Sequence, residues 1–275
     1  MITINNLGFS YGKTEVLKGI SMNLEPGRIY GLLGENGVGK TTLLTLLCGL
    51  KKTMSGSIDV DGFNPFDRKP ALLSSQYYLP DEVAPVSSRA MDWARTNGCF
   101  WPGFTIERFC EIMKVFENDP EKKMSAMSAG QLKKTYISFA LACSARYIYM
   151  DEPSNGLDIP GKAQFRSAIM RYTPEDSTII ISTHQVRDLE NIIDPIIILD
   201  KRDILLNAGV DEISSKMFFD YGHELCSDSL YAEQVPGGFI QVRPNVTGED
   251  SKVNIEALFN AVHNNKNRIK AMFEK

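Results

Sequence analysis

The stretch GLLGENGVGKTTLLTLL, from Gly31 to Leu47, decides the fold of this 275-residue chain. Its first residues are apolar and typical of a buried strand, and its last residues form a second apolar run of helical length. Between the two runs lie Gly34, Gly37 and Gly39. Glycine lets a backbone turn tightly and approach a ligand closely. The stretch therefore predicts a strand, a glycine-rich loop and a helix in direct succession.

The loop from Gly34 to Thr41 matches the phosphate-binding P-loop pattern G-x-x-x-x-G-K-T. Backbone N–H groups of such a loop, and the positive end of the helix that follows, bind phosphate oxygens. We expect Lys40 to reach the β- and γ-phosphates and the Thr41 hydroxyl to hold Mg²⁺. The loop alone does not distinguish kinases, GTPases and ATPases. The predicted nucleotide-binding residues of this segment are Gly34, Glu35, Asn36, Gly37, Val38, Gly39, Lys40, Thr41 and Thr42.

A pair of carboxylates follows the apolar segment YIYM at residues 147–150. Asp151 ends a predicted strand, where its carboxylate is placed to act on Mg²⁺ through water. Glu152 is expected to point to the other side and to serve as a general base or a water-positioning residue. Two acids at a strand end are also common in ordinary loops, so the functional interpretation depends on the P-loop upstream.

Composition restricts the class of protein. The net charge is −4, with 43% hydrophobic and 23% charged residues, which is ordinary for a globular chain and unlike a general nucleic-acid binder. We expect no secretory signal and no membrane span, because no apolar run approaches the ~18–20 residues that cross a bilayer. The cysteines form no Cys-x-x-Cys pair and are predicted to be free, buried or half-buried thiols of a reducing cytosol. They are Cys48, Cys99, Cys110, Cys143 and Cys226.

Strand-like and helix-like segments alternate through most of the chain, which predicts an α/β fold with a mostly parallel sheet covered on both faces. Residues 2–30 read as short strands broken by turns, and 85–121 as a small helical insertion. After Asp211 the pattern changes to one strand and one or two helices, which predicts a C-terminal extension. Further predicted elements are an edge strand at 56–62, helices at 128–145, 160–172 and 185–192, a strand at 177–183 and a hairpin at 195–208.

The tetrapeptide Ser128-Ala129-Gly130-Gln131 opens one of these predicted helices. Ser128 is a good N-cap, and the same helix start could face an anion. This tetrapeptide, the P-loop, YIYMDEPSNGLD and ISTH occur in the order found in ATP-binding cassette (ABC) proteins, which the chain resembles over about residues 1–210. The signature peptide of that family is Ser-Gly-Gly-Gln, so Ala129 is a departure that slightly alters the fit to the γ-phosphate.

The resemblance implies roles for several further residues. Tyr11 matches the aromatic residue that stacks on adenine, and His184 matches the histidine that contacts the γ-phosphate and the attacking water. Asp158 is the acid of the loop that crosses to the partner subunit. Asp81 stands where the family has a glutamine that senses Mg²⁺ and couples to the membrane partner. Gln76 is not that glutamine, because it begins the preceding strand and does not follow it.

The resemblance also implies an architecture. A P-loop NTPase core with a mostly parallel sheet, an N-terminal antiparallel β-subdomain and a small helical subdomain at about 85–145 make up a cassette over 1–210, and 211–275 is an extension of unknown role. Two cassettes pack head to tail, so that each ATP lies between Lys40 of one chain and Ser128 of its partner. The residues that this implies across the interface are Ser128, Gly130, Gln131 and Asp158.

The main hypothesis is an ATP-binding and ATP-hydrolysing subunit, with Glu152 and His184 as its catalytic residues. It would use ATP and Mg²⁺, dimerise with an identical or a related cassette, and power a separate transmembrane permease, an exporter, from the cytoplasmic face of the membrane. No nucleic-acid partner is expected. The alternative is a soluble ABC ATPase with a non-membrane partner such as an iron–sulfur assembly complex. A P-loop kinase or GTPase is disfavoured by the signature peptide.

The helical insertion carries aromatic residues that leave a second question open. They are either an exposed anchor for the permease or ordinary local core packing. These residues are Trp93, Phe100, Trp101 and Phe104.

Overall fold

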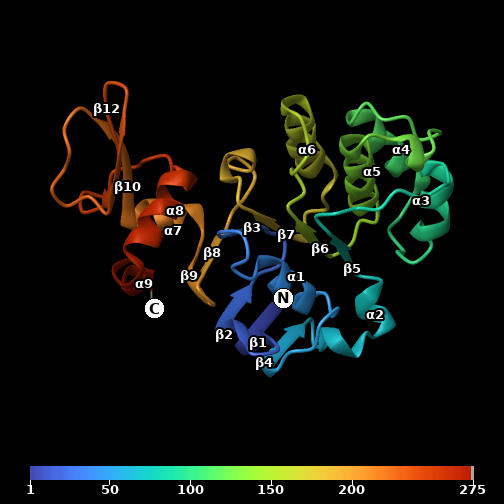
Figure 1. Ribbon diagram of the computed structural model, residues 1–275, viewed down its shortest axis with the longest axis horizontal. Helices are drawn as coiled ribbons and strands as arrows, with labels where there is room; N and C mark the ends of the chain where they lie inside the picture. Colours follow the sequence, from blue (N-terminus) through green and yellow to red (C-terminus); the bar gives the residue numbers. More distant parts are fainter. Residues whose placement is uncertain (274–275) are drawn as a thin grey trace.

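The computed structural model describes residues 1–273, and its centre is a six-stranded sheet (Figure 1). Neighbouring strands of this sheet run parallel except at one edge, where the predicted hairpin adds an antiparallel strand. In spatial order the strands are β5 (Gln76–Leu79), β6 (Tyr147–Asp151), β7 (Thr178–Thr183), β3 (Ile29–Leu33), β8 (Ile196–Asp200) and β9 (Asp203–Ala208). The predicted mostly parallel sheet is confirmed.

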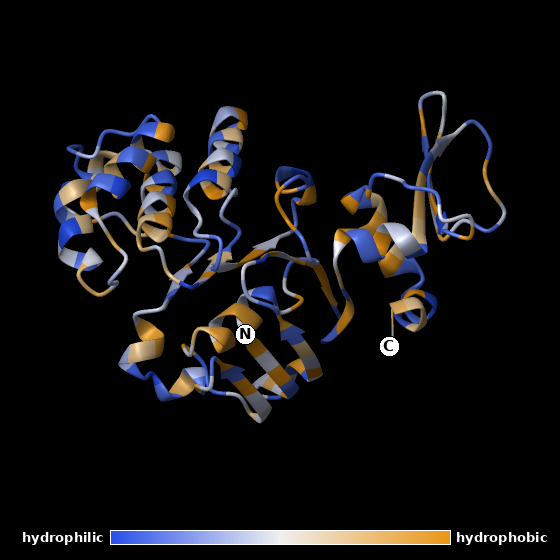
Figure 2. Ribbon diagram, turned by 180° about the vertical axis from the view of Figure 1, so that it is seen from behind, coloured by the Kyte–Doolittle hydropathy of each residue, from blue (hydrophilic) through white to orange (hydrophobic). Residues whose placement is uncertain are grey.

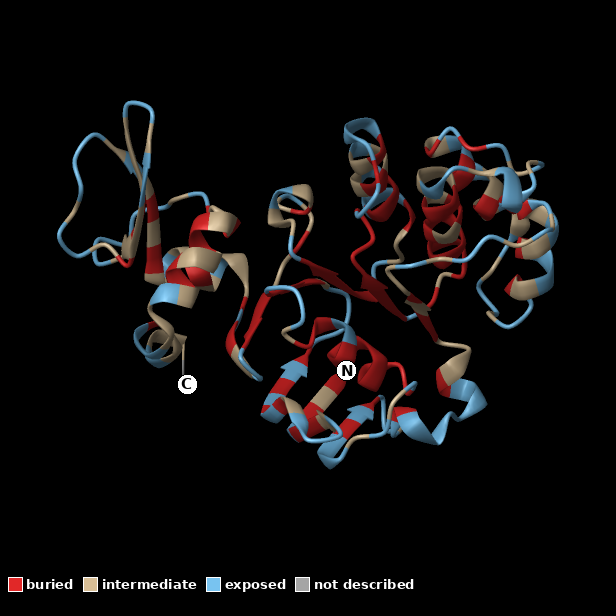
Figure 3. Cartoon of the chain, viewed as in Figure 1, coloured by how far each residue is buried: buried red, intermediate tan, exposed pale blue. Residues whose placement is uncertain are grey.

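The middle strands of the sheet are covered on both faces. Every residue of β6, β7 and β8 is buried, and Figure 3 shows these strands continuously in the buried colour. Such strands need apolar residues at successive positions and not at alternate ones, which explains the runs of isoleucine in the sequence. The carboxyl ends of β3, β6 and β7 therefore open at one edge of a rigid, dry layer.

A three-stranded antiparallel sheet lies beside the P-loop helix α1 (Lys40–Leu47). Hydrophobic and hydrophilic residues alternate along its strands, as Figure 2 shows, because one face packs on the core and the other is solvated. Its strands, in spatial order, are β2 (Thr14–Leu24), β1 (Ile2–Tyr11) and β4 (Ser55–Val60). The edge strand predicted at 56–62 is thus present.

The helical insertion packs around the buried ring of Phe139. Its main helices are α3 (Ala90–Gly98) and α4 (Ile106–Val115). Phe139 belongs to α5 (Ala129–Ala142), which follows the insertion, and α6 (Ile159–Tyr172) lies next to these helices. The rings of Trp93, Trp101 and Phe104 lie 4.6, 5.7 and 5.3 Å from that of Phe139, so these residues serve local packing. Phe100 alone of the four predicted aromatics is largely exposed, at 68%. Short helical turns lie at η1 (Pro65–Asp67), α2 (Pro70–Leu73) and η2 (Met124–Ala126).

The C-terminal unit holds more structure than the sequence predicts. One strand and one or two helices were expected, and both expected helices are present. The strands β10 and β11 and the helix α7 were not predicted, because these segments are short and their apolar residues show no clear period. The elements are α7 (Val210–Lys216), β10 (Met217–Gly222), β11 (Tyr231–Val235), β12 (Gly238–Pro244), α8 (Ile255–Asn264) and α9 (Lys266–Phe273). The strands form a separate antiparallel sheet in the order β10-β12-β11.

Two other predictions are wrong in detail. The helix expected at 185–192 is a single 3-10 turn, η3 (Val186–Asp188). This segment carries the chain from the end of β7 across β3 to the start of β8, and a helix, which rises only ~1.5 Å per residue, covers such a span poorly. Cys99 is exposed and not buried or half-buried.

No helix within residues 1–273 is both long enough and apolar enough to cross a bilayer.

Candidate nucleotide-binding site

The glycine-rich loop lies between β3 and α1 and is closely packed. Gly39 has φ 116°, and a Cβ atom there would come within 2.9 Å of Val16 Cγ1. A Cβ on Gly34 would lie 2.6 Å from the carbonyl oxygen of Leu199. Only glycine fits at both positions. Because α1 has no side-chain cap, the N–H groups of its first turn are left for a ligand, as a phosphate-binding loop requires.

Lys40 places a buried positive charge inside this loop. Its side chain is 6% exposed, and its Nζ donates hydrogen bonds to the carbonyl oxygens of Gly34 at 2.7 Å and Glu35 at 3.2 Å. The same atom lies 3.5 Å from Glu152 Oε1. A buried ammonium is costly unless it is paired, and here two carbonyl oxygens and the Glu152 carboxylate surround it. Its positive charge lies beside the P-loop, where an anionic ligand would bind.

The two residues predicted to hold Mg²⁺ touch each other. Thr41 Oγ1 donates to Asp151 Oδ2 at 2.6 Å, and Ser182 Oγ donates a short hydrogen bond to the other carboxylate oxygen. Hydroxyl and carboxylate oxygens are the hard ligands that Mg²⁺ prefers. Residues 1–273 contain no cluster of three His, Cys, Asp or Glu side chains that would hold a metal unaided. This donor set fits Mg²⁺, because that ion keeps waters and substrate phosphate oxygens in its coordination shell.

Glu152 is fixed beside this pair by its neighbours. His184 Nδ1 lies 2.9 Å from Glu152 Oε1, and the His184 backbone N–H donates to Oε2 at 3.3 Å. Glu152 has φ 44°, a left-handed backbone that is uncommon for a residue with a side chain and recurs at functional sites. With 7% exposure, the carboxylate is oriented by His184 on one side and Lys40 on the other.

These residues line one cavity of about 510 Å³, which we call the nucleotide cavity. Tyr11 stands at it with 49% exposure, its hydroxyl 3.3 Å from Thr42 Oγ1 and its ring 5.0 Å from Lys51 Nζ. Gly34, Glu35 and Val38 belong to the loop but do not line the cavity. The predicted residues that do are Tyr11, Asn36, Gly37, Gly39, Lys40, Thr41, Thr42, Asp81, Asp151, Glu152 and His184.

Other residues that shape the cavity were not predicted. Val16 and Asn155 line it, and Ser182 hydrogen-bonds Asp151. Asn155 belongs to the quoted stretch YIYMDEPSNGLD, and Ser182 comes two residues before His184, so motif proximity was the available signal. Gln76 lies outside the nucleotide cavity. It is buried at the start of β5, where its Nε2 donates to the Cys48 carbonyl oxygen at 3.0 Å.

Three residues of the signature peptide, Ser128, Gly130 and Gln131, line a separate cavity of about 420 Å³, whereas Ala129 does not. Ser128 is the N-cap of α5, as predicted, and forms a capping box with Gln131, since each side chain accepts a hydrogen bond from the other residue's backbone N–H. Asp158 caps α6 by accepting from the Gly161 N–H at 2.9 Å. Ser128, Gly130, Gln131 and Asp158 are thus together in one place, away from Lys40.

Comparisons with known proteins point to one family. The sequence profile of the ABC transporter family matches residues 17–155. The lantibiotic transport ATP-binding protein SrtF of Streptococcus pyogenes is 30% identical over 211 residues, which are 77% of this chain and 92% of that protein. A solved ATP-binding subunit of an ABC transporter superposes with a TM-score of 0.69 at 21% identity, over 78% of this chain and 91% of that one. A dimeric ATP-binding cassette with bound ADP and Pi gives 0.66 at 20% identity, over 76% and 98%.

Proposed function

This chain belongs to the ABC transporter family as an ABC-type ATPase subunit, and we propose that it powers a separate transmembrane permease, in the direction of export. The observation that carries this proposal is the convergence in one cavity of the buried charges Lys40, Asp151 and Glu152. Export is supported by the likeness to a lantibiotic transport protein. The chain's ATPase chemistry would then work on the permease from the cytoplasmic face of the membrane.

We assign the triphosphate of ATP to the glycine-rich loop and Lys40, and the adenine to the exposed ring of Tyr11. Thr41 and Asp151 are the residues that would hold Mg²⁺, which, when bound, neutralises phosphate charge and orients the substrate. The Thr41–Asp151 hydrogen bond keeps the two oxygens within reach of one ion. Lys40 then supplies positive charge where negative charge is concentrated on the substrate.

We assign the proton-accepting step to Glu152. Its carboxylate is placed by His184, and its buried position limits its contact with bulk water. A water held between this carboxylate and the terminal phosphate would lose its proton to Glu152 as it attacks. His184 is the positioning residue of this pair and a contact for the phosphate that leaves.

The two separate cavities support a head-to-tail dimer. A chain whose Ser128 faces one cavity and whose Lys40 faces another cannot bring both to the same nucleotide by itself. In a dimer with two-fold symmetry, the nucleotide cavity of each chain can face the Ser128 cavity of its partner. Both groups then reach the same nucleotide. The partner is a second copy or a related cassette. ATP bound between two such chains would favour the closed dimer through its higher affinity for that state.

We place the permease contact on the groove between the sheet and the helical insertion. This groove of about 660 Å³ is lined mostly by apolar side chains, among them the exposed Phe100 and Leu50 and the half-buried Trp101. Asp81 follows β5, which borders the groove. An apolar groove with a polar rim suits an amphipathic helix of a partner.

We also propose the domain division that the motifs suggest. Residues 1–210 would form the cassette, with a helical subdomain at about 85–145, and residues 211–275 an extension. Support comes from the sheet β10-β12-β11, which shares no strand with the sheets of the cassette.

The decisive experiment on the chemistry is Glu152→Gln in the full chain. ATP turnover should fall by about 100-fold or more, because the amide cannot accept the proton. An ATP-bound dimer should accumulate on size exclusion, since the nucleotide is no longer consumed. Glu175→Gln, at an exposed glutamate that does not line the cavity, is the matched control. Turnover near that of the unchanged chain would show that Glu152 is not the base.

The permease assignment is tested by purification from detergent-solubilised membranes. A membrane protein should copurify with the full chain, and Phe100→Ser should reduce its recovery while leaving ATP turnover intact. Recovery only in soluble complexes would instead favour an ABC ATPase with a non-membrane partner, such as an iron–sulfur assembly complex.

A further inference from the structure

Lys133 is a buried lysine that the reaction scheme above does not use. It lies on α5, one turn after the N-cap Ser128, and its side chain is only 5% exposed. A buried ammonium is expensive to desolvate, and the burial lowers the pKa of Lys133 from its usual range. The neighbouring carboxylates must therefore keep the group charged.

Among residues 1–273, the polar contacts of the Lys133 side chain come from Pro80 and Asp81, the dipeptide that follows β5. Its Nζ donates to the carbonyl oxygen of Asp81 at 2.5 Å and to that of Pro80 at 3.3 Å. The same atom lies 3.6 Å from Asp81 Oδ1. This loop therefore satisfies two of the three donors of the ammonium and places a carboxylate beside it as an ion pair. The start of the signature helix is thereby tied to the end of β5, the strand that lies beside α5 (Figure 1).

Asp81 lies at the edge of the nucleotide cavity, which it lines together with Asp151 and Glu152. Its Oδ1 also accepts a hydrogen bond from Asn155 Nδ2 at 3.3 Å. A third carboxylate at this edge would repel an anionic substrate unless its charge were balanced. Lys133 provides that balance, and the charges of Asp81, Asp151 and Glu152 in turn partly offset the lowering of its pKa by burial.

We propose that Lys133 is a positioning residue that neutralises Asp81 and holds it against α5, so that an acid at this position is compatible with binding of a triphosphate. The inference rests on the proposed function, because it takes ATP as the occupant of the nucleotide cavity. It adds a residue that neither the P-loop nor the signature tetrapeptide contains. It also explains how a carboxylate is tolerated where the family has a neutral glutamine.

The test is a double-mutant cycle on the full chain with Lys133→Met, Asp81→Asn and the pair together. Binding is measured with fluorescent mant-ATP and Mg²⁺, and turnover by phosphate release, giving kcat and KM separately. Lys133→Met should weaken ATP binding and raise KM about tenfold, because Asp81 is left unbalanced. Adding Asp81→Asn should restore affinity to within about threefold of the unchanged chain. Lys133→Arg keeps the charge and should retain affinity, and Lys123→Met, at an exposed lysine near the same helix, is the control.

Additive effects of the two substitutions, or unchanged affinity in Lys133→Met, would overturn the inference. If Lys133→Met lacks a cooperative thermal transition, the cycle is repeated with Lys133→Gln, whose amide can still donate to the carbonyl oxygens of Pro80 and Asp81 but carries no charge. Lys133→Gln should weaken ATP binding about tenfold, and adding Asp81→Asn should restore it to within about threefold. Unchanged affinity in Lys133→Gln, or no recovery in the pair, would overturn the inference. Lys40→Ala distinguishes a failure of the proposed function from a failure of the role proposed for Lys133. If neither the unchanged chain nor Lys40→Ala binds ATP, the proposed function fails, whereas binding that depends on Lys40 but shows no coupling overturns only the role of Lys133.

Discussion

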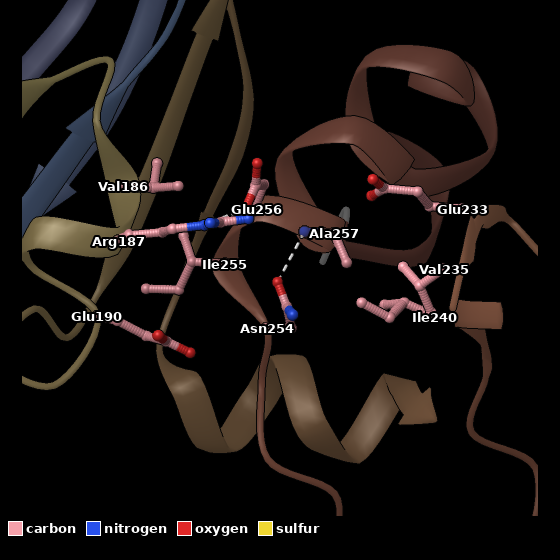
Figure 4. A pocket seen from close by; sticks show the side chains of 10 residues that line it. All are labelled: Val186, Arg187, Glu190, Glu233, Val235, Ile240, Asn254, Ile255, Glu256 and Ala257. Atoms are coloured by element: carbon pink, nitrogen blue, oxygen red, sulfur yellow. Dashed lines mark hydrogen bonds and ion pairs between the residues drawn. The ribbon is translucent and has the colours of Figure 1, made fainter. Parts of the chain in front are cut away.

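The nucleotide cavity and a second cavity share one short segment of chain but differ in kind. His184 lines the first, and the residues that follow it line the second, which lies between η3 and the C-terminal unit (Figure 4). This second cavity, here called the joint cavity, measures about 290 Å³. It is lined by Val186, Arg187, Glu190, Glu233, Val235, Ile240, Asn254, Ile255, Glu256 and Ala257.

The two cavities differ most in where their charges lie. Lys40, Asp151 and Glu152 are between 2% and 7% exposed. In the joint cavity, the ion pair of Arg187 and Glu256 is as short as 2.6 Å, but its side chains are 82% and 46% exposed. Buried charges destabilise a fold unless something compensates, so their clustering points to chemistry. An exposed ion pair costs little and contributes little, and is compatible with a simple contact surface.

Apolar packing is what holds the C-terminal unit to the cassette. Leu258 and Ile269 are fully buried and share one hydrophobic core with residues of β8. Two ion pairs add to this contact, Lys270 with Asp203 at 2.6 Å and Lys266 with Asp200. Buried charges therefore define the nucleotide cavity, whereas the joint cavity is a space left where apolar packing joins the C-terminal unit to the cassette.

The largest expected effect is on the nucleotide cavity. Lys40→Ala should weaken ATP binding by about 100-fold, because a charge-assisted contact contributes up to ~3 kcal/mol. Calorimetry or mant-ATP titration measures the loss. Lys52→Ala, at an exposed lysine beyond α1, is the control and should bind normally. Unchanged binding in Lys40→Ala would remove the basis for treating this cavity as the active one.

Removal of Mg²⁺ should produce the second-largest effect, a loss of ATP turnover. With EDTA in excess, phosphate release should fall by about 100-fold or more, because an ion that stabilises phosphate charge contributes several kcal/mol. Added Mg²⁺ should restore the rate. Thr41→Val should raise the Mg²⁺ concentration needed for half-maximal turnover, whereas Thr53→Val, outside the cavity, should not. Turnover that persists in EDTA would contradict the assignment of Thr41 and Asp151.

Substitutions in the apolar contact between the C-terminal unit and the cassette should change the stability of the protein and not its ATPase activity. Leu258→Ala should lower the free energy of unfolding by about 2–5 kcal/mol, because it leaves a hole in the core. The kcat of the folded protein should stay within about twofold. Val246→Ala, 85% exposed in the same unit, should change neither quantity. A fall in kcat as large as that in Glu152→Gln would show that the two regions are functionally joined.

The smallest effect is expected for the exposed ion pair of the joint cavity. Glu256→Gln should cost less than about 1 kcal/mol in denaturant unfolding, and the cost should shrink at high salt. A cycle with Arg187→Gln isolates the pair itself. If either substitution changed ATP turnover by more than tenfold, the joint cavity would have to be regarded as part of the machinery around His184.

The features that the sequence predicts best are those that depend on a few neighbouring residues. The P-loop, the strand ending at Asp151 and the cap at Ser128 each depend on neighbouring residues, and each lies where it was expected. Prediction from the sequence failed where partners are distant or patterns weak. The segment 185–192, which the sequence predicts to be a helix, forms only the single 3-10 turn η3. The strands β10 and β11 were not predicted because they are short and their residues show no clear alternation of apolar and polar side chains.

The sequence by itself determined the class of fold, the phosphate loop and the residue types of the site, because glycine conformation, strand hydrophobicity and helix capping act over a few neighbouring positions. The hydrogen bond from Thr41 to Asp151 and the position of Lys133 beside Asp81 come from the tertiary fold. It also separated Ser128 from Lys40 into different cavities. These relations join residues far apart in the chain, and they arise only when helices and strands pack and desolvate the charges between them.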